Sequence, residues 1–475
     1  MNTPAFRLYA LIALLFALLV GQTSRWTVFE AEALRDNKLN ARELLAEQRI
    51  HRGAIRAAGG EVIARSVEGP GKTFSRRYPL GELFAHPVGY SFIDIGRAEL
   101  EQSRNDELSG VRDEVGSIVD QLSGREREGQ QLHTTLDLGA QRLALEALGG
   151  QRGAVVAMEP ETGRIRVMAS TPSYDPDALR RDGAFRQLSG AEGSPLLNRA
   201  TAGRYPPGST FKVVTAVAAI DSGKFTKDSV LDGSSPKTIS GAPLSNFGDA
   251  DYGQIPLTLA LTKSVNTVWA QVGVDVGAQT MQRYMERFGF YDRAEVDLPT
   301  GQRTRSGVYK RSGIEQVTDD SVDVGRVAIG QGDLLASPLQ MAMVASAVAN
   351  DGTLMKPRLS DRVVDRDGRT VERYEPDELR EVMKPETAQE VGDMMASVVR
   401  EGTGTAAALA GFPVAGKTGT AELNVEQGIN QPWFIGFAPR DNPRIAIAVS
   451  IENSSGTGGE VAAPIAKRVM EELLR

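Results

Sequence analysis

The sequence predicts an α+β protein in which an antiparallel sheet is flanked by helices, with a separate N-terminal domain and one membrane-spanning helix. Three observations lead to this fold class. A charge-free apolar stretch occupies residues 8–24, a hairpin pattern occupies 153–170, and three short apolar runs separated by turn-rich segments occupy 412–451. A mostly helical stretch, residues 209–400, lies between the hairpin and these runs. We therefore expect a helical subdomain inserted between strands of the sheet.

The apolar N-terminal stretch is long enough to serve as an anchor. From Leu8 to Ser24 there are 17 residues without a charge, close to the lower limit for a helix that crosses a bilayer. A cleavable signal peptide is the alternative, but no clear small-x-small cleavage site lies between Leu18 and Thr23. We expect residues 1–25 to form a cytoplasmic tip and an uncleaved single-pass helix in the plasma membrane, with the remainder of the chain outside the cell.

Composition bounds the remaining classes. The 475 residues are 41% apolar and 24% charged, which is ample for more than one globular unit. The formal charge of −7 gives no indication of the positive charge that nucleic-acid binding requires. The sequence has no basic cluster, zinc-ligand spacing or phosphate-binding loop, so no metal, nucleotide or other cofactor is implied. The lack of Cys is compatible with an exported chain that uses no disulfides.

Three short motifs follow one another along the chain. They are Ser-x-x-Lys at 209–212, Ser-x-Asn at 264–266 and Lys-Thr-Gly-Thr at 417–420. Second copies of the first two occur at 234–237 and 103–105, so each motif alone is a weak signal. The proline inside the second Ser-x-x-Lys removes an amide donor and is poorly tolerated beyond a first helical turn. We interpret that second copy as a loop.

The surroundings of Ser209 predict the start of a buried helix. A Tyr-Pro-Pro-Gly lead-in at 205–208 is incompatible with helix, an almost wholly apolar run follows at 211–220, and Gly223 is the expected stop. Residues three apart lie on one helix face, so the Lys212 amine is expected beside the Ser209 hydroxyl. The free amides of the first turn carry partial positive charge, which suits an oxyanion.

Lysine is the base that the composition leaves for this serine. The chain has no Cys, and its three His all precede the motifs, so a Ser-His-Asp or Cys-His mechanism would need a histidine from another region. A lysine accepts a proton at neutral pH only if burial and nearby positive charge lower its pKa. Lys417, expected on the opposite wall of the site, would supply that second charge.

Each motif also has a purely structural interpretation. Residues 417–419 could be a surface hairpin, the middle motif could lie inside a helix spanning 257–272, and Ser209 could be only a helix cap. Short patterns of this kind occur often by chance, whereas three in order with a matching helix context do not. In the functional interpretation, Gly419 lets a ligand backbone approach the strand, so a peptide could add to it as a further strand.

The ordered set resembles the three motifs of penicillin-binding proteins and serine β-lactamases, here with Val265 in the middle position. The similarity covers roughly residues 131–475. The chain resembles a class B (monofunctional) penicillin-binding protein, a peptidoglycan D,D-transpeptidase of the penicillin-binding-protein A or cell-division transpeptidase type. Further stretches that match the family are residues 153–163, 168–170, 198–200, 205–208, 329–332, 337–340 and 350–352.

The resemblance implies a domain organisation. Residues 131–475 would form the transpeptidase domain, of α/β (α+β) class, with a five-stranded antiparallel sheet flanked by helices and an all-helical subdomain. Residues 26–130 would form an elongated, non-catalytic pedestal of the dimerisation-domain type, because 52–55 and 60–64 are similar to the box that opens it. About 100 residues are too few for the added glycosyltransferase domain of bifunctional relatives.

The resemblance also implies a reaction in which no cofactor takes part. Ser209 would accept the acyl group of a stem peptide ending in D-Ala-D-Ala, with Lys212 as its base. Ser264 and Asn266 would relay protons and hold the lysine and the substrate amide. An amine of a neighbouring stem would then attack the acyl-enzyme and form a cross-link during elongation or division, and β-lactams would trap Ser209.

The third motif would bind the end of the substrate. Lys417, Thr418 and Thr420 would hold its terminal carboxylate, with Gly419 between them. The backbone amides of Ser209 and Thr420 would form the oxyanion hole, which is usually the largest contribution in acyl transfer.

Three other functions share some of these features. A β-lactamase or β-lactam sensor has the same motifs, but a lactamase needs no anchor or pedestal. A D,D-carboxypeptidase uses the same residues and passes the acyl group to water. A non-catalytic activator of a polytopic SEDS-type glycosyltransferase would bind its partner through the anchor and pedestal, and this role is compatible with catalysis.

Overall fold

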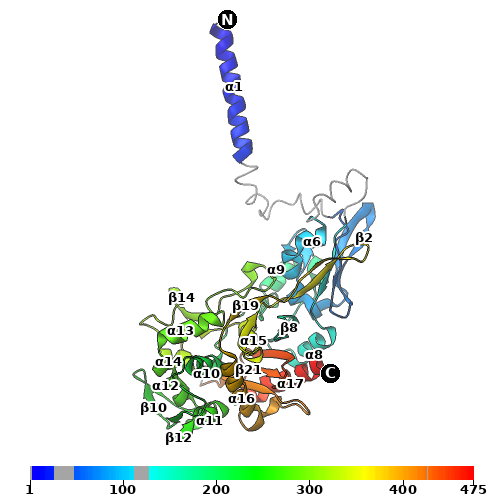
Figure 1. Ribbon diagram of the computed structural model, residues 1–475. Coiled ribbons are helices and arrows are strands. Elements are labelled where there is room, and N and C mark those ends of the chain that lie inside the picture. The colour runs from blue at the N-terminus through cyan, green and yellow to red at the C-terminus, as the bar shows by residue number, and fades with distance from the viewer. Residues whose placement is uncertain (1–2, 26–47, 112–127, 425) are drawn as a thin grey trace.

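The structure is a computed structural model that describes residues 3–25, 48–111, 128–424 and 426–475 (Figure 1). The expected start of the pedestal at residue 26 lies outside these ranges. Helix α1 (Thr3–Ser24) stands apart from the folded body, and its segment Phe6–Ser24 is apolar and entirely exposed, with a mean hydropathy of 1.8. An apolar helix of this length that packs against none of the described residues suits membrane anchoring.

The five-stranded antiparallel sheet expected from the sequence forms the centre of the molecule. Its last three strands form a meander, and the hairpin at 153–171 continues the sheet beside them. Nearly every residue of the inner strands is buried, as expected for a sheet covered on both faces. In sheet order the strands are β20 (Ala415–Asn424), β21 (Ile429–Ala438), β22 (Ile445–Ile451), β7 (Gly153–Met158) and β8 (Ile165–Thr171).

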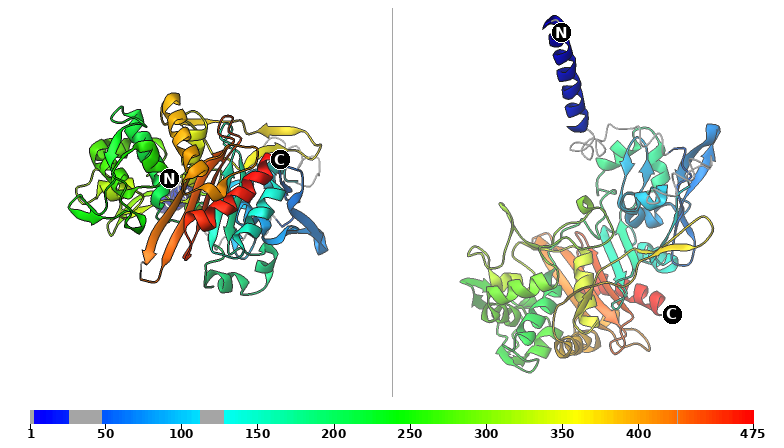
Figure 2. Two further views of the ribbon diagram at one scale, coloured as in Figure 1. Left: turned by 90° about the horizontal axis from the view of Figure 1, so that it is seen from below. Right: turned by 45° about the horizontal axis from the view of Figure 1, so that its top comes forward.

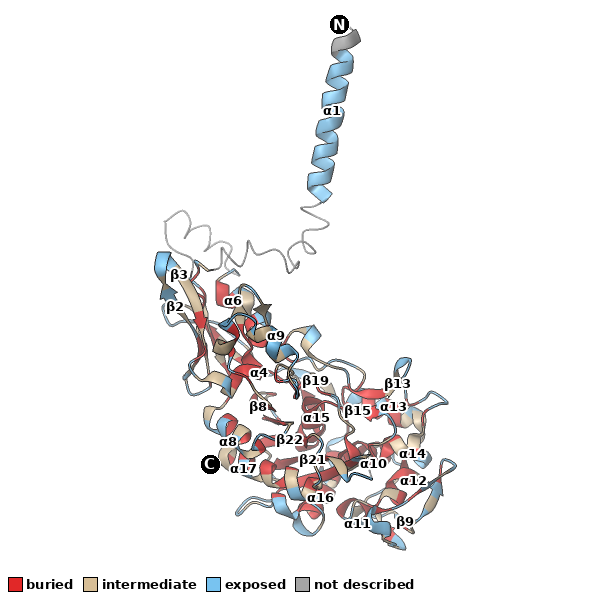
Figure 3. Cartoon of the chain, turned by 180° about the vertical axis from the view of Figure 1, so that it is seen from behind, coloured by how far each residue is buried: buried red, intermediate tan, exposed pale blue. Residues whose placement is uncertain are grey.

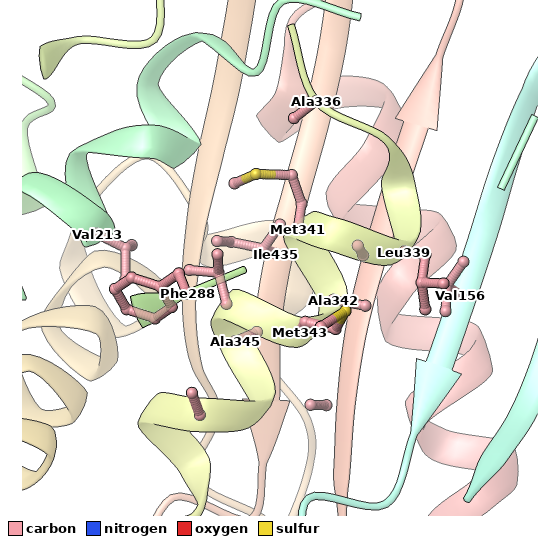
Figure 4. Packing of buried hydrophobic residues seen from close by; sticks show 14 of the residues in the cluster. Val156, Val213, Phe288, Ala336, Leu339, Met341, Ala342, Met343, Ala345 and Ile435 are labelled. Carbon is pink, nitrogen blue, oxygen red and sulfur yellow. The ribbon is translucent and has the colours of Figure 1, made fainter. Parts of the chain in front are cut away.

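Helices cover both faces of this sheet. Helices α8 (Leu138–Leu148) and α17 (Ala463–Leu474), both predicted, bury their apolar sides on one face together with Val155 and Val449. Helix α15 (Pro338–Ala349) is buried all round on the other face (Figure 3). Its Leu339 lies near Val156 of β7, and Ala345 lies near Phe288 (Figure 4).

The helical subdomain is inserted between β8 and β20, as predicted, and short β-strands accompany its helices. In Figure 2 this subdomain (green) and the N-terminal sheet (blue) lie on opposite sides of the orange strands. Its helices are α10 (Lys212–Asp221), α11 (Leu257–Thr262), α12 (Asn266–Val276), α13 (Ala278–Arg287), α14 (Val324–Ala328) and α16 (Pro385–Glu401). Its strands are β9 (Val230–Asp232), β10 (Lys237–Ile239), β11 (Ala242–Leu244), β12 (Gln254–Pro256), β13 (Gly307–Lys310), β14 (Gly313–Glu315), β15 (Leu334–Leu335), β16 (Thr353–Met355) and β19 (Glu378–Glu381).

A second sheet of six strands builds the N-terminal domain. Strand β6 runs parallel to β1 and antiparallel to β17, so segments on both sides of residue 130 share this sheet. The predicted division at 130 stays a prediction. In sheet order the strands are β18 (Thr370–Arg373), β17 (Ser360–Val364), β6 (Gln131–Thr134), β1 (Ile55–Arg56), β2 (Val62–Gly69) and β3 (Thr73–Arg77). Beside it lie α4 (Ala85–Val88), β4 (Ser91–Phe92), β5 (Gly96–Arg97), α5 (Glu99–Ser103), α6 (Asn105–Ser109) and α9 (Ala184–Ser189).

Candidate active site

Ser209 lies in a tight turn that precedes its helix. Residues Gly208–Phe211 form a 3₁₀ turn, and the α-helix α10 begins only at Lys212. The helix therefore starts three residues later than predicted, because the two prolines and Gly208, with its φ of +52°, shape the entry. In a 3₁₀ turn residues three apart eclipse one another, so Ser209 and Lys212 point to the same side.

Close glycine contacts fix this turn against its neighbours. A Cβ at Gly330 would lie 1.9 Å from the carbonyl oxygen of Gly208, and the Gly208 amide donates to the Gly330 carbonyl at 3.0 Å. A Cβ at Gly419 would lie 2.7 Å from the carbonyl oxygen of Pro207 and 3.0 Å from Thr210 Cγ2. Gly419 therefore permits a close approach of β20 to the chain's own serine turn, and its expected role in admitting a ligand backbone stays a prediction.

The middle motif breaks a helix. Helix α11 ends at Thr262, Ser264 adopts a left-handed φ of +59°, and α12 begins at Asn266. The interpretation of this motif as a helix interior is therefore wrong. A left-handed conformation at a non-glycine residue is strained and is found mainly at functional sites. Here it places the Ser264 carbonyl and hydroxyl and the Asn266 side chain on one side of the break, toward Lys212.

Ser264 lies between two buried lysines. The amine of Lys212 donates to the Ser264 carbonyl at 2.8 Å and to Asn266 Oδ1 at 2.7 Å, and it lies 3.3 Å from Ser264 Oγ. From the strand β20, the amine of Lys417 lies 2.9 Å from the same Ser264 Oγ and donates to the Thr418 carbonyl at 3.0 Å. The third motif is thus a buried strand and not a surface hairpin. Within the described chain, Ser209 makes no side-chain hydrogen bond, so its hydroxyl is unengaged.

Both lysines lose much of their basicity. Burial, and then the charge of Lys417, lower the pKa of Lys212 well below its ordinary value. Burial lowers the pKa of Lys417 to about 7. Both side chains are fully buried, and neither forms an ion pair with a carboxylate of the described residues. A lysine in such a setting can accept a proton at neutral pH, as a general base must.

The threonines of the third motif have hydrogen-bond partners outside β20. Thr418 shares a short hydrogen bond with the hydroxyl of Thr403, and the Thr420 hydroxyl accepts from the Gly458 amide at 3.1 Å. Their expected role in binding a carboxylate stays a prediction.

Neither second motif copy forms this arrangement within the described part of the chain. Ser234 and Lys237 both engage Asp232 at a loop, as predicted. Arg104, inside the second Ser-x-Asn, pairs with Asp297 at the junction with the N-terminal domain. The local sequence context was therefore sufficient to reject the second Ser-x-x-Lys, at 234–237.

Three contacts of the site were not predicted. They involve Thr403, Gly330 and Glu452, which lie far in sequence from the residues that they touch. The Gly-rich stretches at 330–332 and 456–459 are a signal that could have indicated close packing. The sequence around Glu452 has no pattern that distinguishes this residue.

The comparisons with known proteins agree with this geometry. Residues 153–471 match the penicillin binding protein transpeptidase domain, and residues 52–132 match the penicillin binding protein A dimerisation domain. The peptidoglycan D,D-transpeptidase PbpA of Mycolicibacterium smegmatis is 34% identical over 502 residues, covering 100% of this chain and 99% of that protein. The PbpA of Mycobacterium tuberculosis H37Rv is 33% identical over 501 residues, with the same coverage.

A solved structure is similar over most of the chain. Penicillin-binding protein A from Mycobacterium tuberculosis, as its ceftriaxone acyl-enzyme complex, superposes with a TM-score of 0.82 at 32% identity. The match covers 91% of this chain and 100% of that structure. With the family models and the full-length relatives, it shows that this chain belongs to the penicillin-binding protein transpeptidase family.

Proposed function

We propose that this protein is a peptidoglycan D,D-transpeptidase that works through an acyl-enzyme on Ser209. The Ser209 oxygen attacks the carbonyl carbon of the D-Ala-D-Ala bond, and its proton passes to the neutral Lys212 amine. The tetrahedral intermediate collapses, the C–N bond breaks, and the departing D-alanine amine receives that proton. An amine of a neighbouring stem then attacks the ester carbonyl and loses its proton to Lys212. The ester C–O bond breaks, Lys212 returns that proton to the Ser209 oxygen, and a new amide cross-link is released.

The observation that carries this proposal is the pair of buried lysines that share the Ser264 hydroxyl. Lys212 Nζ and Lys417 Nζ lie 3.3 and 2.9 Å from that oxygen, so the hydroxyl can transfer a proton between the two amines. The low pKa of Lys212 supplies a neutral base beside the nucleophile. A site built only for structure has no use for two buried amines without a carboxylate, because each costs free energy to desolvate.

The third motif, on β20, would orient the substrate. In the proposal, Lys417 with Thr418 and Thr420 binds the terminal carboxylate, and the amides of Ser209 and Thr420 stabilise the oxyanion. An anion bound beside Lys417 favours the protonated amine, so substrate binding itself would keep this lysine charged.

Intact-protein mass spectrometry after incubation with benzylpenicillin tests the proposal. A stable adduct on Ser209, absent in Ser209→Ala at an unchanged melting temperature, is the expected result. Rapid loss of the adduct after the drug is removed would indicate a lactamase, and the lack of any adduct would favour a non-catalytic activator. Release of D-alanine without cross-linked product from paired stem peptides would indicate a carboxypeptidase.

We also infer that α1 anchors the protein as a single-pass helix with its N-terminus inside the cell. The exposed apolar surface of Phe6–Ser24 supports membrane anchoring. Together with a pedestal over residues 26–130, the helix would bind a SEDS-type polytopic glycosyltransferase. Protease protection in inverted vesicles tests the orientation, and co-purification with and without α1 tests the partnership.

A further inference from the structure

The segment that leads into Ser209 is held from the side by the sheet. Residues 206 and 207 are both proline, so they offer no amide to a hydrogen-bond ladder. Instead, the indole nitrogen of Trp433 on β21 donates to the Pro206 carbonyl at 2.9 Å. Tyr205 exchanges two backbone hydrogen bonds with Ala336, at 3.0 and 2.8 Å, and its ring meets that of Trp433 edge to face. The position of the nucleophile therefore depends on contacts that segment 205–208 makes with distant strands.

Glu452 is the charged centre of these contacts. It follows β22 directly, and one carboxylate oxygen accepts from both the Tyr205 hydroxyl and Arg199 Nε, the latter at 2.9 Å. The Arg199 and Glu452 side chains are 3% and 15% exposed. Arg199 also donates to the carbonyls of Gly193 and Ser194. Hydrogen bonds to a buried carboxylate are stronger than neutral ones, so this group fixes the Tyr205 hydroxyl tightly.

Tyr205 lies close to the reacting Ser209 along the chain. Three residues lie between Tyr205 and Ser209, and the last of them, Gly208, packs on β20, where an added Cβ would lie 3.2 Å from the Thr420 carbonyl carbon. A shift of Tyr205 therefore moves Ser209 relative to the Thr420 amide and to Lys212. We propose that Glu452, acting through the hydroxyl of Tyr205, is a positioning residue for Ser209. This inference rests on the proposed function.

Tyr205→Phe is the first test, because it removes one hydroxyl and keeps both the ring contact with Trp433 and the pair of Glu452 with Arg199. Stopped-flow acylation of the full chain by a fluorescent penicillin should show roughly a tenfold lower acylation rate constant, as misplacement of a reacting group by a fraction of an ångström would cause. The dissociation constant of the initial non-covalent complex and the pH profile of acylation should stay unchanged.

Tyr309→Phe is the matched control. Its hydroxyl also donates one hydrogen bond, to the Arg305 carbonyl at 2.8 Å, at an exposed position. The control should acylate at the wild-type rate. A wild-type rate in Tyr205→Phe would overturn the proposal. So would a slower rate that returns to the wild-type value once it is divided by the fraction of folded protein at the assay temperature, because the tyrosine would then serve only stability.

A double-mutant cycle with Glu452→Gln tests whether Glu452 acts through Tyr205. If it does, the two substitutions together slow acylation by much less than the product of their separate effects. Multiplicative effects would show that Glu452 acts by another route and would overturn that part of the proposal. Acylation of the wild type and of Tyr309→Phe shows that the proposed function holds, whereas failure of both to acylate would contradict that function itself.

Discussion

Two clusters of buried positive charge differ in their cations and in the group that lies between them. In the N-terminal domain, Arg52 Nε and Arg76 Nε bind the two oxygens of Glu101 at 2.8 and 2.6 Å, and the Glu101 side chain is fully buried. In the active site, Lys212 and Lys417 are equally buried, but a neutral serine hydroxyl stands where the first cluster has a carboxylate.

The difference determines which groups keep their charge. Burial raises the pKa of Glu101, but Arg76 and Arg52 outweigh it and hold the pKa below its ordinary value, so the pedestal cluster stays ionised. Burial, and then the charge of Lys417, lower the pKa of Lys212, and no carboxylate of the described residues offsets them. A buried carboxylate between arginines, which stay protonated, thus suits a structural joint, whereas buried lysines without a carboxylate suit a base.

The largest expected effect comes from removing the base. Lys212→Met keeps most of the side-chain volume and deletes the proton acceptor, so acylation by a fluorescent penicillin should slow by roughly 10² to 10⁴. The melting temperature should stay the same or rise, because no buried amine must be desolvated. A wild-type acylation rate in this variant would rule out Lys212 as the base.

Removing the carboxylate of the other cluster should affect stability and not chemistry. Glu101→Gln leaves two buried arginines without a counterion, which should cost about 3–5 kcal/mol of unfolding free energy. Denaturant unfolding measures this, and Glu192→Gln is the matched control, since the Glu192 side chain pairs with Arg152 but is 91% exposed. Glu192→Gln should change stability by less than about 1 kcal/mol. Folded Glu101→Gln protein that acylates more slowly than wild type would contradict the division of roles.

The repulsion between the lysines can be tested through pH. Below about pH 7 Lys417 is protonated, and its charge disfavours the protonated form of Lys212. Lys417→Met removes that charge, so the pKa of Lys212 should rise and the ascending limb of the acylation pH profile should move to higher pH. An unmoved or downward-shifted limb would show that the two amines do not interact in this way.

Glu99 offers the smallest test, as a buried carboxyl that pairs with no cation of the described residues. Burial raises its pKa to about 8, and Asn198 is its hydrogen-bond partner, with the Tyr90 and Tyr174 rings close by. Because the folded form retains a proton that the unfolded chain loses, stability should fall as pH rises from about 4.5 to about 8.

Glu99→Gln should remove this slope and raise the melting temperature at pH 8.5 by a few degrees. Glu161→Gln, at an exposed position, should retain the wild-type pH dependence. An unchanged slope in Glu99→Gln would assign the pH dependence to other groups.

The sequence predicted the parts of the site that follow from local pattern. Motif order was sufficient to predict that Lys212 and Lys417 lie near each other, and both approach the Ser264 hydroxyl. Apolar periodicity was sufficient to locate α17 and the meander of the central sheet. Contacts between segments far apart in the chain were not predictable, because the Glu452 carboxylate meets Tyr205 across 247 residues. The left-handed Ser264 was also missed, since a serine carries no signal for positive φ.

The N-terminal sheet contains strands from both sides of residue 130, and this has a practical consequence. Strand β6 is flanked by β1 from the N-terminal segment and by β17 from beyond residue 359. A fragment cut at residue 130 would leave β6 with a row of unpaired backbone groups, the kind of open edge along which chains aggregate. It would also leave the apolar Leu132 without the cover of Ile55. The catalytic part is therefore better produced together with its pedestal, and a graft of a foreign pedestal would need matching strand edges.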